Sequence, residues 1–299
     1  MIRVVAPGLH ATVQDAGRTR HLRAGVPTAG PADRAAHAFA NALVGNAPGA
    51  AAIEIVGLPF AFVAERALLV AVTGRDVRLV GRDPLPGWTS VFLRAGDEVR
   101  VIGRSRYTYL AAAGAFDARV DLGSRAAYPV ASLGAPQLSA GDRVVVRPAA
   151  FEAARAGRSA PAPPYARDAV RAVRGPHDDR VDAGAFFAAT FTVDERSDRM
   201  GVRLRGGPIE TSGGELLTTG VAEGAVQVPS GGEPIVLLAD HQTTGGYPIV
   251  ATVIAADLPI VAQREPGEAL RFVAVDDSEA VAELQRVRRD AFALRVASD

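Results

Sequence analysis

The sequence lacks two reactive residue types, since its 299 residues include no cysteine and no lysine. Without cysteine, disulfides, thiolate nucleophiles and zinc–thiolate sites are excluded. All 33 basic residues are arginine, so a Schiff-base lysine, a lysine general base and a phosphate-loop lysine are excluded as well. No biotin can be covalently bound to this sequence, because biotin attachment requires a lysine.

The sequence also lacks an excess of charge of either sign and any long apolar run. Its 33 acidic residues balance the 33 basic ones, which argues against nucleic acid or an anionic membrane surface as a partner. No apolar stretch reaches about 18 residues without a break, so no membrane span is predicted. The N-terminus lacks the apolar segment of a signal peptide. We therefore expect a cytoplasmic protein.

Short apolar runs separated by Gly, Pro and Asp turns predict a mainly β protein. Residues 98–102 and 143–147 alternate with a period of two, as strands with one buried face do. A turn of the type Gly–acid precedes three predicted strands, at residues 95–97, 140–142 and 266–268. Each turn places glycine where a positive φ is required.

Three helices are expected. Residues 33–44 form the first, with Asp33 as N-cap and Gly45–Asn46 as the stop. Residues 182–191 form the second. The third covers residues 277–294, capped by Asp277 or Ser278, with one face made of Ala280, Leu284, Val287 and Ala291.

A segment rich in Ala, Arg and Pro divides the chain. Pro161, Pro163 and Pro164 preclude regular strand pairing there. We expect an N-terminal β domain at residues 1–150, a linker at 151–168 and a C-terminal β domain at 169–299.

Two polar clusters lie in the first half of the sequence. Gln14, Asp15 and Arg18 lie within five residues, so a loop holding them could grip a polar ligand. The alternative is a loop closed by an Asp15–Arg18 pair, with Asp33 as a plain helix cap. In the second cluster, Asn41 and Glu54 are either ligand-binding residues, or a helix-end residue and a surface acid.

Two further clusters lie in the second half. Arg199 and Arg203 fall in a run where arginines alternate with acids. They could neutralise an anionic substrate or belong to a solvated charge run. The segment 240–248 joins two predicted strands, but it is too long and too polar for a simple hairpin. Its glycines, Gly245 and Gly246, permit close approach of a ligand to the backbone, whereas Tyr247 could simply be a packing residue of a wide loop.

The order and spacing of a series of short motifs from about residue 3 to residue 275 resemble one family. That family is variously called the C-type subunit of 5-oxoprolinase, allophanate hydrolase subunit 2 or KipA, and it is similar to part of the carboxyltransferase region of urea carboxylase. The motifs are Gln14–Asp15, Gly17–Arg18, Gly25–Pro27, Asp33, Ala40–Asn41, Leu43–Asn46, Ile53–Glu54, Thr73–Gly74, Pro86–Trp88, Gly96–Asp97, Tyr109–Ala111, Leu122–Arg125, Ser197–Gly201, Gly224–Pro229 and Gln242–Pro248. The sequence departs from the family pattern at Thr28–Gly30 and Gly114–Ala115.

The resemblance implies two cyclophilin-like β-barrel domains with a few short helices. It implies a B-type (KipI-like) partner subunit and an A-type lactamase-like subunit, with ATP, together with magnesium, as cofactor. The complex would cleave 5-oxoproline to glutamate. The alternatives are a carboxyltransferase component of a urea carboxylase or allophanate hydrolase type of enzyme, and a KipA-type regulatory protein.

The resemblance and the residue types together give a candidate site, with no metal ligands assigned. An arginine would bind a substrate carboxylate, acids would place a metal-bound nucleotide or water, and amide donors would stabilise an oxyanion. The catalytic candidates are Asp15, Arg18, Asp33 and Gln242. The substrate-binding candidates are Gln14, Asn41, Glu54, Arg199, Arg203, Gln227, Gly245, Gly246, Tyr247, Asp257 and Gln263.

Overall fold

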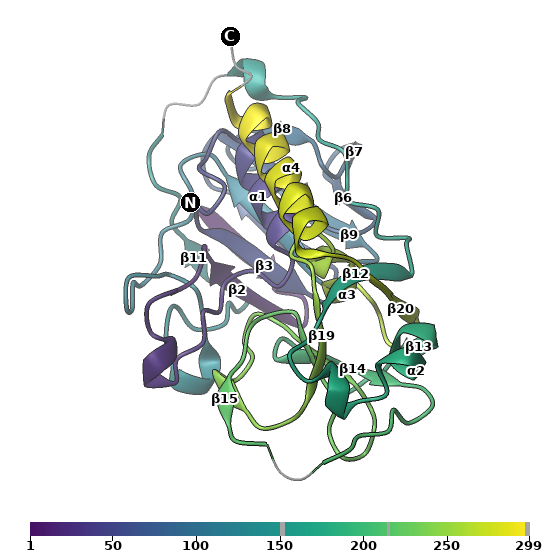
Figure 1. The fold of residues 1–299 in the computed structure, drawn as a ribbon. Coiled ribbons are helices and arrows are strands. Elements are labelled where there is room, and N and C mark those ends of the chain that lie inside the picture. Colours follow the sequence, from purple (N-terminus) through teal and green to yellow (C-terminus); the bar gives the residue numbers. More distant parts are fainter. Residues whose placement is uncertain (150–152, 214–215, 297–299) are drawn as a thin grey trace. The chain divides into compact units, whose positions relative to one another are not determined.

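The computed structural model describes residues 1–149, 153–213 and 216–296. Its chain is mainly β with few helices, as expected, and it divides into two compact units. Unit 1 contains Met1–Arg18 and Ala29–Pro163 together with residues from Arg288 onward, and unit 2 contains Thr19–Thr28 and Pro164–Val287. Figure 1 shows the elements of both units along the chain. Among the described residues, no helix has the length and apolar character needed to cross a membrane.

Unit 1 is built from two antiparallel sheets rather than from one closed barrel. The six-stranded sheet has the order β11-β1-β4-β9-β6-β7, and the five-stranded sheet has the order β2-β3-β10-β5-β8. Apolar residues of both sheets, such as Phe62 in β4 and Leu110 in β10, belong to one buried core. The strands are β1 (Ile2–Ala6), β2 (His10–Gln14), β3 (Ala52–Val56), β4 (Phe60–Ala64), β5 (Leu68–Thr73), β6 (Val77–Val80), β7 (Pro84–Pro86), β8 (Ser90–Leu93), β9 (Glu98–Gly103), β10 (Thr108–Ala112) and β11 (Arg143–Val144).

Helix α1 (Arg34–Leu43) packs against β5 and β10 of the five-stranded sheet. The predicted N-cap is confirmed, because the Asp33 side chain accepts a hydrogen bond from the Ala36 backbone N–H at 2.9 Å. The helix ends at Val44, and Gly45 follows with a φ of 82°.

Unit 2 contains a closed barrel of seven strands in the order β12-β19-β16-β17-β14-β13-β20. Its strands are antiparallel except for the parallel pair β12 and β20, and a separate two-stranded ribbon joins β15 to β18. The strands are β12 (Ala169–Arg174), β13 (Phe191–Val193), β14 (Gly201–Arg205), β15 (Thr219–Gly220), β16 (Ala225–Gln227), β17 (Ile235–Leu237), β18 (Thr244–Gly245), β19 (Ile249–Val253) and β20 (Ala269–Ala274).

The remaining elements are helices. Helix α2 (Ala183–Ala188) has the expected Asp182 cap but ends three residues before the predicted limit, because Phe191 begins β13. Helix α3 (Leu258–Ala262) was not predicted. The 3-10 turns are η1 (Leu22–Ala24), η2 (Pro129–Ala131), η3 (Ala153–Arg155) and η4 (Asp178–Arg180).

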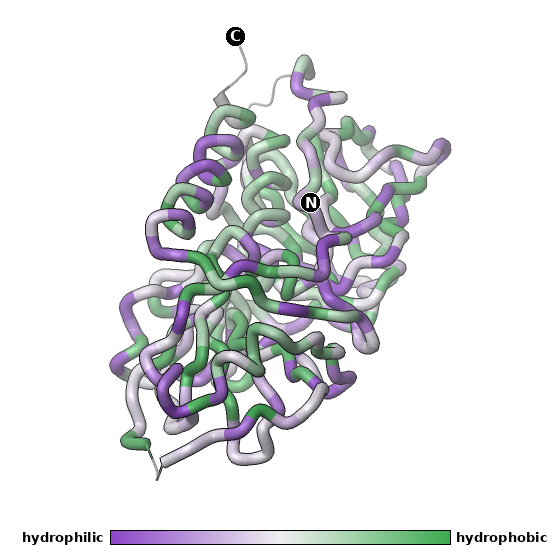
Figure 2. The backbone as a smooth tube through the Cα atoms, turned by 45° about the vertical axis from the view of Figure 1, so that its right-hand side comes forward, coloured by the Kyte–Doolittle hydropathy of each residue, from purple (hydrophilic) through white to green (hydrophobic). Residues whose placement is uncertain are grey.

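Helix α4 (Asp277–Val296) carries the predicted face but not the predicted cap. Ala291 is only 4% exposed, whereas its neighbour Phe292 is 57% exposed, and Figure 2 shows hydrophilic and hydrophobic stretches alternating along the helix. The cap is Asp276, whose Oδ1 accepts from the Glu279 N–H at 2.9 Å and from the Ser278 hydroxyl at 2.6 Å. The choice of Asp277 or Ser278 as cap was therefore wrong by one or two residues.

The three predicted glycine–acid turns are confirmed and share one geometry. Gly96, Gly141 and Gly267 have φ values of 89°, 93° and 86°. In each turn the acid accepts from the backbone N–H three residues earlier: Asp97 from Arg94 at 2.7 Å, Asp142 from Ser139 at 2.7 Å and Glu268 from Glu265 at 2.9 Å. These turns lead into β9, β11 and β20.

Candidate functional site

A buried carboxylate lies at the centre of the polar cluster in unit 1. Glu54 on β3 is 2% exposed, and its Oε2 accepts from the Tyr109 hydroxyl at 2.7 Å and the Ala32 N–H at 2.9 Å. The Tyr109 hydroxyl in turn accepts from the Asp33 N–H at 2.7 Å. Burial, followed by the negative charge of Glu54, raises the pKa of Tyr109 well above its ordinary value. Glu54 is therefore not the surface acid of the alternative interpretation.

Gln14 and Asn41 lie on either side of His37, at the face of α1 that packs on the sheet. The Gln14 amide donates to the Ala127 carbonyl at 3.1 Å, and its Oε1 has no partner within the described residues. His37 Nε2 lies 3.2 Å from the Gln14 carbonyl oxygen and 3.5 Å from Asn41 Nδ2. Burial lowers the pKa of His37 from 6.5 to about 4. Asn41 donates to the Ala50 carbonyl at 2.9 Å, which ties the helix to the following loop.

Asp15 and Arg18 hold the loop after β2 against residues 124–126. The Asp15 carboxylate accepts from the Gly17 N–H at 3.0 Å, the Arg125 N–H at 2.7 Å and the Ser124 hydroxyl at 2.5 Å. Arg18 is 2% exposed and donates to the Ala126 carbonyl. These contacts describe a closed loop, and the catalytic roles predicted for both residues remain predictions.

In unit 2, the segment 240–248 is anchored by an ion pair at its first residue. Arg199 donates from Nε and Nη2 to the two Asp240 oxygens at 2.8 and 2.9 Å, a bidentate geometry. The Asp240 N–H also donates to the Arg199 carbonyl at 3.0 Å. The guanidinium of Arg199 thus fixes the start of the segment.

The middle of the segment brings together two predicted site residues, Gln242 and Gln227. The Gln242 amide donates to Gln227 Oε1 at 3.1 Å. Gly245 lies directly beside this pair, since a Cβ on Gly245 would approach Gln227 Nε2 to 2.6 Å. Tyr247 is 50% exposed, and Gly246 is exposed at the same end of the segment.

Arg203 and Gln263 lie elsewhere in unit 2. Arg203 is exposed on β14, whereas Gln263 is 1% exposed at the end of α3.

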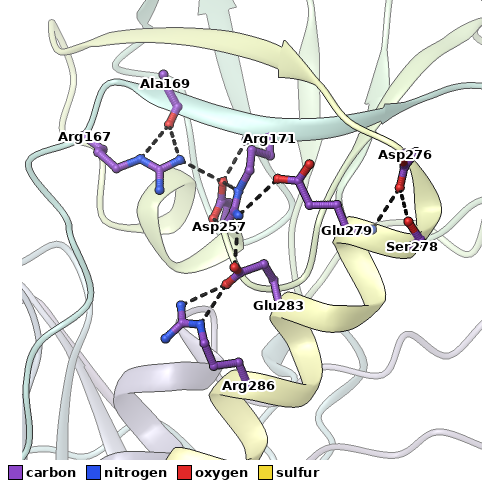
Figure 3. A network of polar contacts seen from close by, with 9 residues as sticks. All are labelled: Arg167, Ala169, Arg171, Asp257, Asp276, Ser278, Glu279, Glu283 and Arg286. Carbon is purple, nitrogen blue, oxygen red and sulfur yellow. Dashed lines mark hydrogen bonds and ion pairs between the residues drawn. The ribbon is translucent and has the colours of Figure 1, made fainter.

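Asp257 belongs to an ion-pair network that links β12, α3 and α4 (Figure 3). Its carboxylate accepts from Arg171 Nε at 3.0 Å and Nη2 at 2.8 Å. Arg171 Nη1 also lies 3.5 Å from carboxylate oxygens of both Glu279 and Glu283. The pKa of Arg171 is raised chiefly by its hydrogen bonds to Asp257.

Two of the acids assigned to a nucleotide-bound metal already accept several hydrogen bonds from the protein. Mg²⁺ requires oxygen ligands in near-octahedral geometry, but Asp15 and Asp257 direct their oxygens at N–H and hydroxyl donors. Within the part of the chain that the structure describes, no group of three His, Asp or Glu side chains could hold a metal ion.

Reasoning from single residues missed Tyr109, His37 and Asp240 as members of these clusters. Tyr109 and Asp240 lay in segments already singled out, but their partners are distant: Tyr109 is 55 residues from Glu54, and Asp240 is 41 residues from Arg199. His37 belongs to no motif that the sequence singles out.

Comparison with known protein families gives the class of this chain. Residues 24–274 match the family described as carboxyltransferase domain, subdomain A and B. The chain belongs to this family.

Individual members of the family show which proteins the chain resembles. The chain is 33% identical over 301 residues to the C-type subunit of 5-oxoprolinase from Escherichia coli, covering 97% of this chain and 96% of the relative. It is 28% identical to urea amidolyase of Lachancea kluyveri, covering 91% of this chain but 17% of that protein. The crystal structure of Kluyveromyces lactis urea carboxylase superposes with a TM-score of 0.87 at 25% identity, over 98% of this chain and 29% of that chain. The chain is therefore similar to a whole subunit in one case and to a part of larger enzymes in the others.

Proposed function

We propose that this chain is the C-type subunit of an ATP-dependent 5-oxoprolinase, which cleaves 5-oxoproline to glutamate together with A-type and B-type subunits. One observation carries the proposal: the match to the C-type subunit of the E. coli enzyme extends over 96% of that relative. The matched urea amidolyase, in contrast, is several times longer than this chain.

The chemistry of the reaction fits amide donors better than a nucleophile from this chain. The lactam of 5-oxoproline is a stable amide, so its carbonyl oxygen must be activated before water attacks. We assign this donor role to the segment 240–248, with Gln242 and the backbone amides of Gly245 and Gly246. Arg199 acts as a positioning residue, because its guanidinium is engaged by Asp240.

ATP with magnesium remains part of the proposal, but we place its binding mainly on the partner subunits. The N–H donors around Asp15 and Asp257 leave these carboxylates poorly suited to a metal. The absence of lysine also excludes a phosphate-loop lysine on this chain.

Reconstitution tests the proposal. The chain is purified with its B-type and A-type partners, and glutamate formation from 5-oxoproline is measured with and without ATP, with urea as the competing substrate. We expect ATP-dependent glutamate formation that requires all three proteins. No turnover of 5-oxoproline, combined with turnover of urea, would overturn the assignment.

A variant pair then tests the segment 240–248. Gln242→Leu removes the amide donor, and we expect kcat to fall by about 100- to 1000-fold, as for the loss of one oxyanion donor. Gln285→Leu on exposed α4 serves as the matched control and should retain wild-type kinetics. Wild-type turnover by Gln242→Leu would exclude Gln242 from catalysis.

A carboxyltransferase component of a urea-handling enzyme is the second candidate. It is favoured by the likeness to the K. lactis urea carboxylase structure. This candidate requires a separate biotinylated protein, because the sequence has no lysine to carry biotin.

A further inference from the structure

Three adjacent strands of the barrel in unit 2 place an arginine and a glutamine in one row of directly paired residues across the sheet. Arg203 on β14 is paired with Ile235 on β17, and Ile235 is paired with Gln227 on β16. Directly opposed residues of antiparallel strands point to the same face of the sheet. Arg203 and Gln227 therefore leave the same face two strand spacings apart, about 10 Å, with the apolar side chain of Ile235 between them.

At one end of the row, the exposed guanidinium of Arg203 lies at a cavity. Arg203, Ile235 and Glu233 line a cavity of about 160 Å³. Within the described residues, no hydrogen bond or ion pair engages the Arg203 guanidinium. The neighbouring Arg196 is already bonded to Asp194, at 2.9 Å from both Nε and Nη2. Arg203 is thus the guanidinium of this cavity that can bind an incoming anion.

The Gln227 end of the row has an available donor. Gln227 is 1% exposed, and its Oε1 already accepts from Gln242. Its Nε2 has no hydrogen-bond partner among the residues that the structure describes. A buried amide N–H₂ without an acceptor is unfavourable, so an acceptor supplied by a ligand would satisfy it.

Gly245 permits the close approach of the ribbon to this donor. Its φ lies outside the left-handed region that favours glycine, so the backbone does not require a glycine there. A Cβ at this position would nevertheless meet Gln227 Nε2 at 2.6 Å. The ribbon of β15 and β18 therefore lies against the Gln227 amide and covers this end of the row.

We propose that Arg203 and Gln227 are the two ends of a subsite for a small molecule that carries both a carboxylate and an amide carbonyl. The carboxylate binds the Arg203 guanidinium, the carbonyl oxygen accepts from Gln227 Nε2, and the apolar part lies on Ile235. This inference rests on the proposed function, because 5-oxoproline has both groups flanking one small ring. It assigns the substrate carboxylate to Arg203 rather than to Arg199.

Binding measurements with two ligands test the Arg203 end. Calorimetry on the reconstituted complex compares 5-oxoproline with 2-pyrrolidinone, which has the lactam but no carboxylate. We expect Arg203→Met to weaken 5-oxoproline binding by about 10- to 100-fold, the usual effect of losing a charged hydrogen bond, and to leave 2-pyrrolidinone binding unchanged. Arg289→Met on exposed α4 is the matched control.

A glycine pair tests the Gln227 end without removing a polar group. Gly245→Ala should push on the Gln227 amide and weaken both ligands about equally. Gly220→Ala is the matched control, because Gly220 pairs with Thr244 in the same ribbon and a Cβ there has no neighbour within 4 Å. Gln227→Leu should reproduce the loss, and thermal unfolding establishes that each variant is folded.

The outcomes separate this subsite from the proposed function. Equal affinity of wild type and Arg203→Met for 5-oxoproline, or no binding of 5-oxoproline by wild type, would overturn the subsite. Turnover of 5-oxoproline that is unaffected in Arg203→Met and Gly245→Ala would overturn the subsite and leave the proposed function standing. Binding that follows the expected pattern, without ATP-dependent turnover, would support the subsite and overturn the proposed reaction.

Discussion

At the scale of single residues, the polar side chains of unit 1 are specified by partners far away in the sequence. The Asp33 cap could be predicted because its acceptor role is satisfied within three residues. The burial of Glu54 could not, because its hydroxyl donor, Tyr109, reaches it only once β3 and β10 have paired. Local patterns therefore identified the candidate residues but not their environments.

His37 makes the stability of the protein dependent on pH. Its pKa in the folded protein is about 4 against 6.5 in the unfolded chain, so the unfolded state binds more protons between these values. Stability contributed by the neutral ring is complete above pH 6.5 and is lost as the pH falls toward 4. The shift corresponds to about 3 kcal/mol.

Urea denaturation of wild type and His37→Gln at pH 7 and pH 4.5 checks this expectation. Wild type should lose more unfolding free energy than the variant between the two pH values, because glutamine does not titrate. His21→Gln is the control and should follow wild type. Parallel pH profiles for wild type and His37→Gln would show that His37 is not the buried titrating group.

At the scale of elements, the segments with strong local sequence signals were predicted correctly, whereas a short strand at a sheet edge and a short helix were not. The first helix and the three turns were predicted because glycine, cap and period agree within a few residues. The strand expected at 143–147 is only Arg143–Val144 long, because residues 145–147 leave β1 and pair with residues 115–117 instead. Helix α3 was missed because it has five residues and contains Pro259, which is tolerated in a first turn.

The N-cap of α4 predicts different effects on helix stability for substitutions of two neighbouring residues, Asp276 and Asp277. Asp276→Ala removes the acceptor of two hydrogen bonds, so the first turn of the helix should be destabilised by about 1 kcal/mol. Asp277→Ala, one residue later, should have a much smaller effect. Amide hydrogen exchange of residues 278–282 measures both, and equal exchange in the two variants would contradict the assignment of Asp276 as the cap.

The network of Figure 3 gives a second prediction for elements. Arg171→Met would leave the Asp257 carboxylate, which is 3% exposed, without its bidentate partner, at a cost of about 3 kcal/mol in unfolding free energy. Arg286→Met also removes an ion pair, but its side chain is 57% exposed, and exposed pairs contribute about 0–1 kcal/mol. Chemical denaturation of both variants measures the difference, and similar losses would show that Asp257 does not depend on Arg171.

At the scale of the whole molecule, chain order and spatial units do not coincide. Residues 19–28 belong to unit 2 although they lie between segments of unit 1, and the chain passes from Pro163 in unit 1 to Pro164 in unit 2. A sequence divided only by composition yields contiguous domains, so the composition gave no sign that residues 19–28 belong to unit 2. The family, in contrast, could be identified from motifs spread along nearly the whole chain.

Avidin distinguishes the two enzymatic candidates for the assembled complex. Because cleavage of 5-oxoproline to glutamate transfers no carboxyl group and so needs no biotin, this reaction of the reconstituted subunits should be unaffected by excess avidin. A urea-handling carboxyltransferase must receive its carboxyl group from a biotinylated partner, so avidin should abolish its turnover. Assays with both substrates, with and without avidin, give the answer, and avidin-sensitive cleavage of 5-oxoproline would contradict the proposed function.

The repeated glycine–acid turns have a consequence for the order in which the chain assembles. Each turn closes a contact over three residues, whereas the strand pairing of Arg3 with Arg143 closes a loop of about 140 residues. Loop-closure entropy makes the short contacts form faster and at lower cost. The turns that precede β9, β11 and β20 are therefore expected to form early in folding. The long-range strand pairings of the sheets and the barrel would form after them.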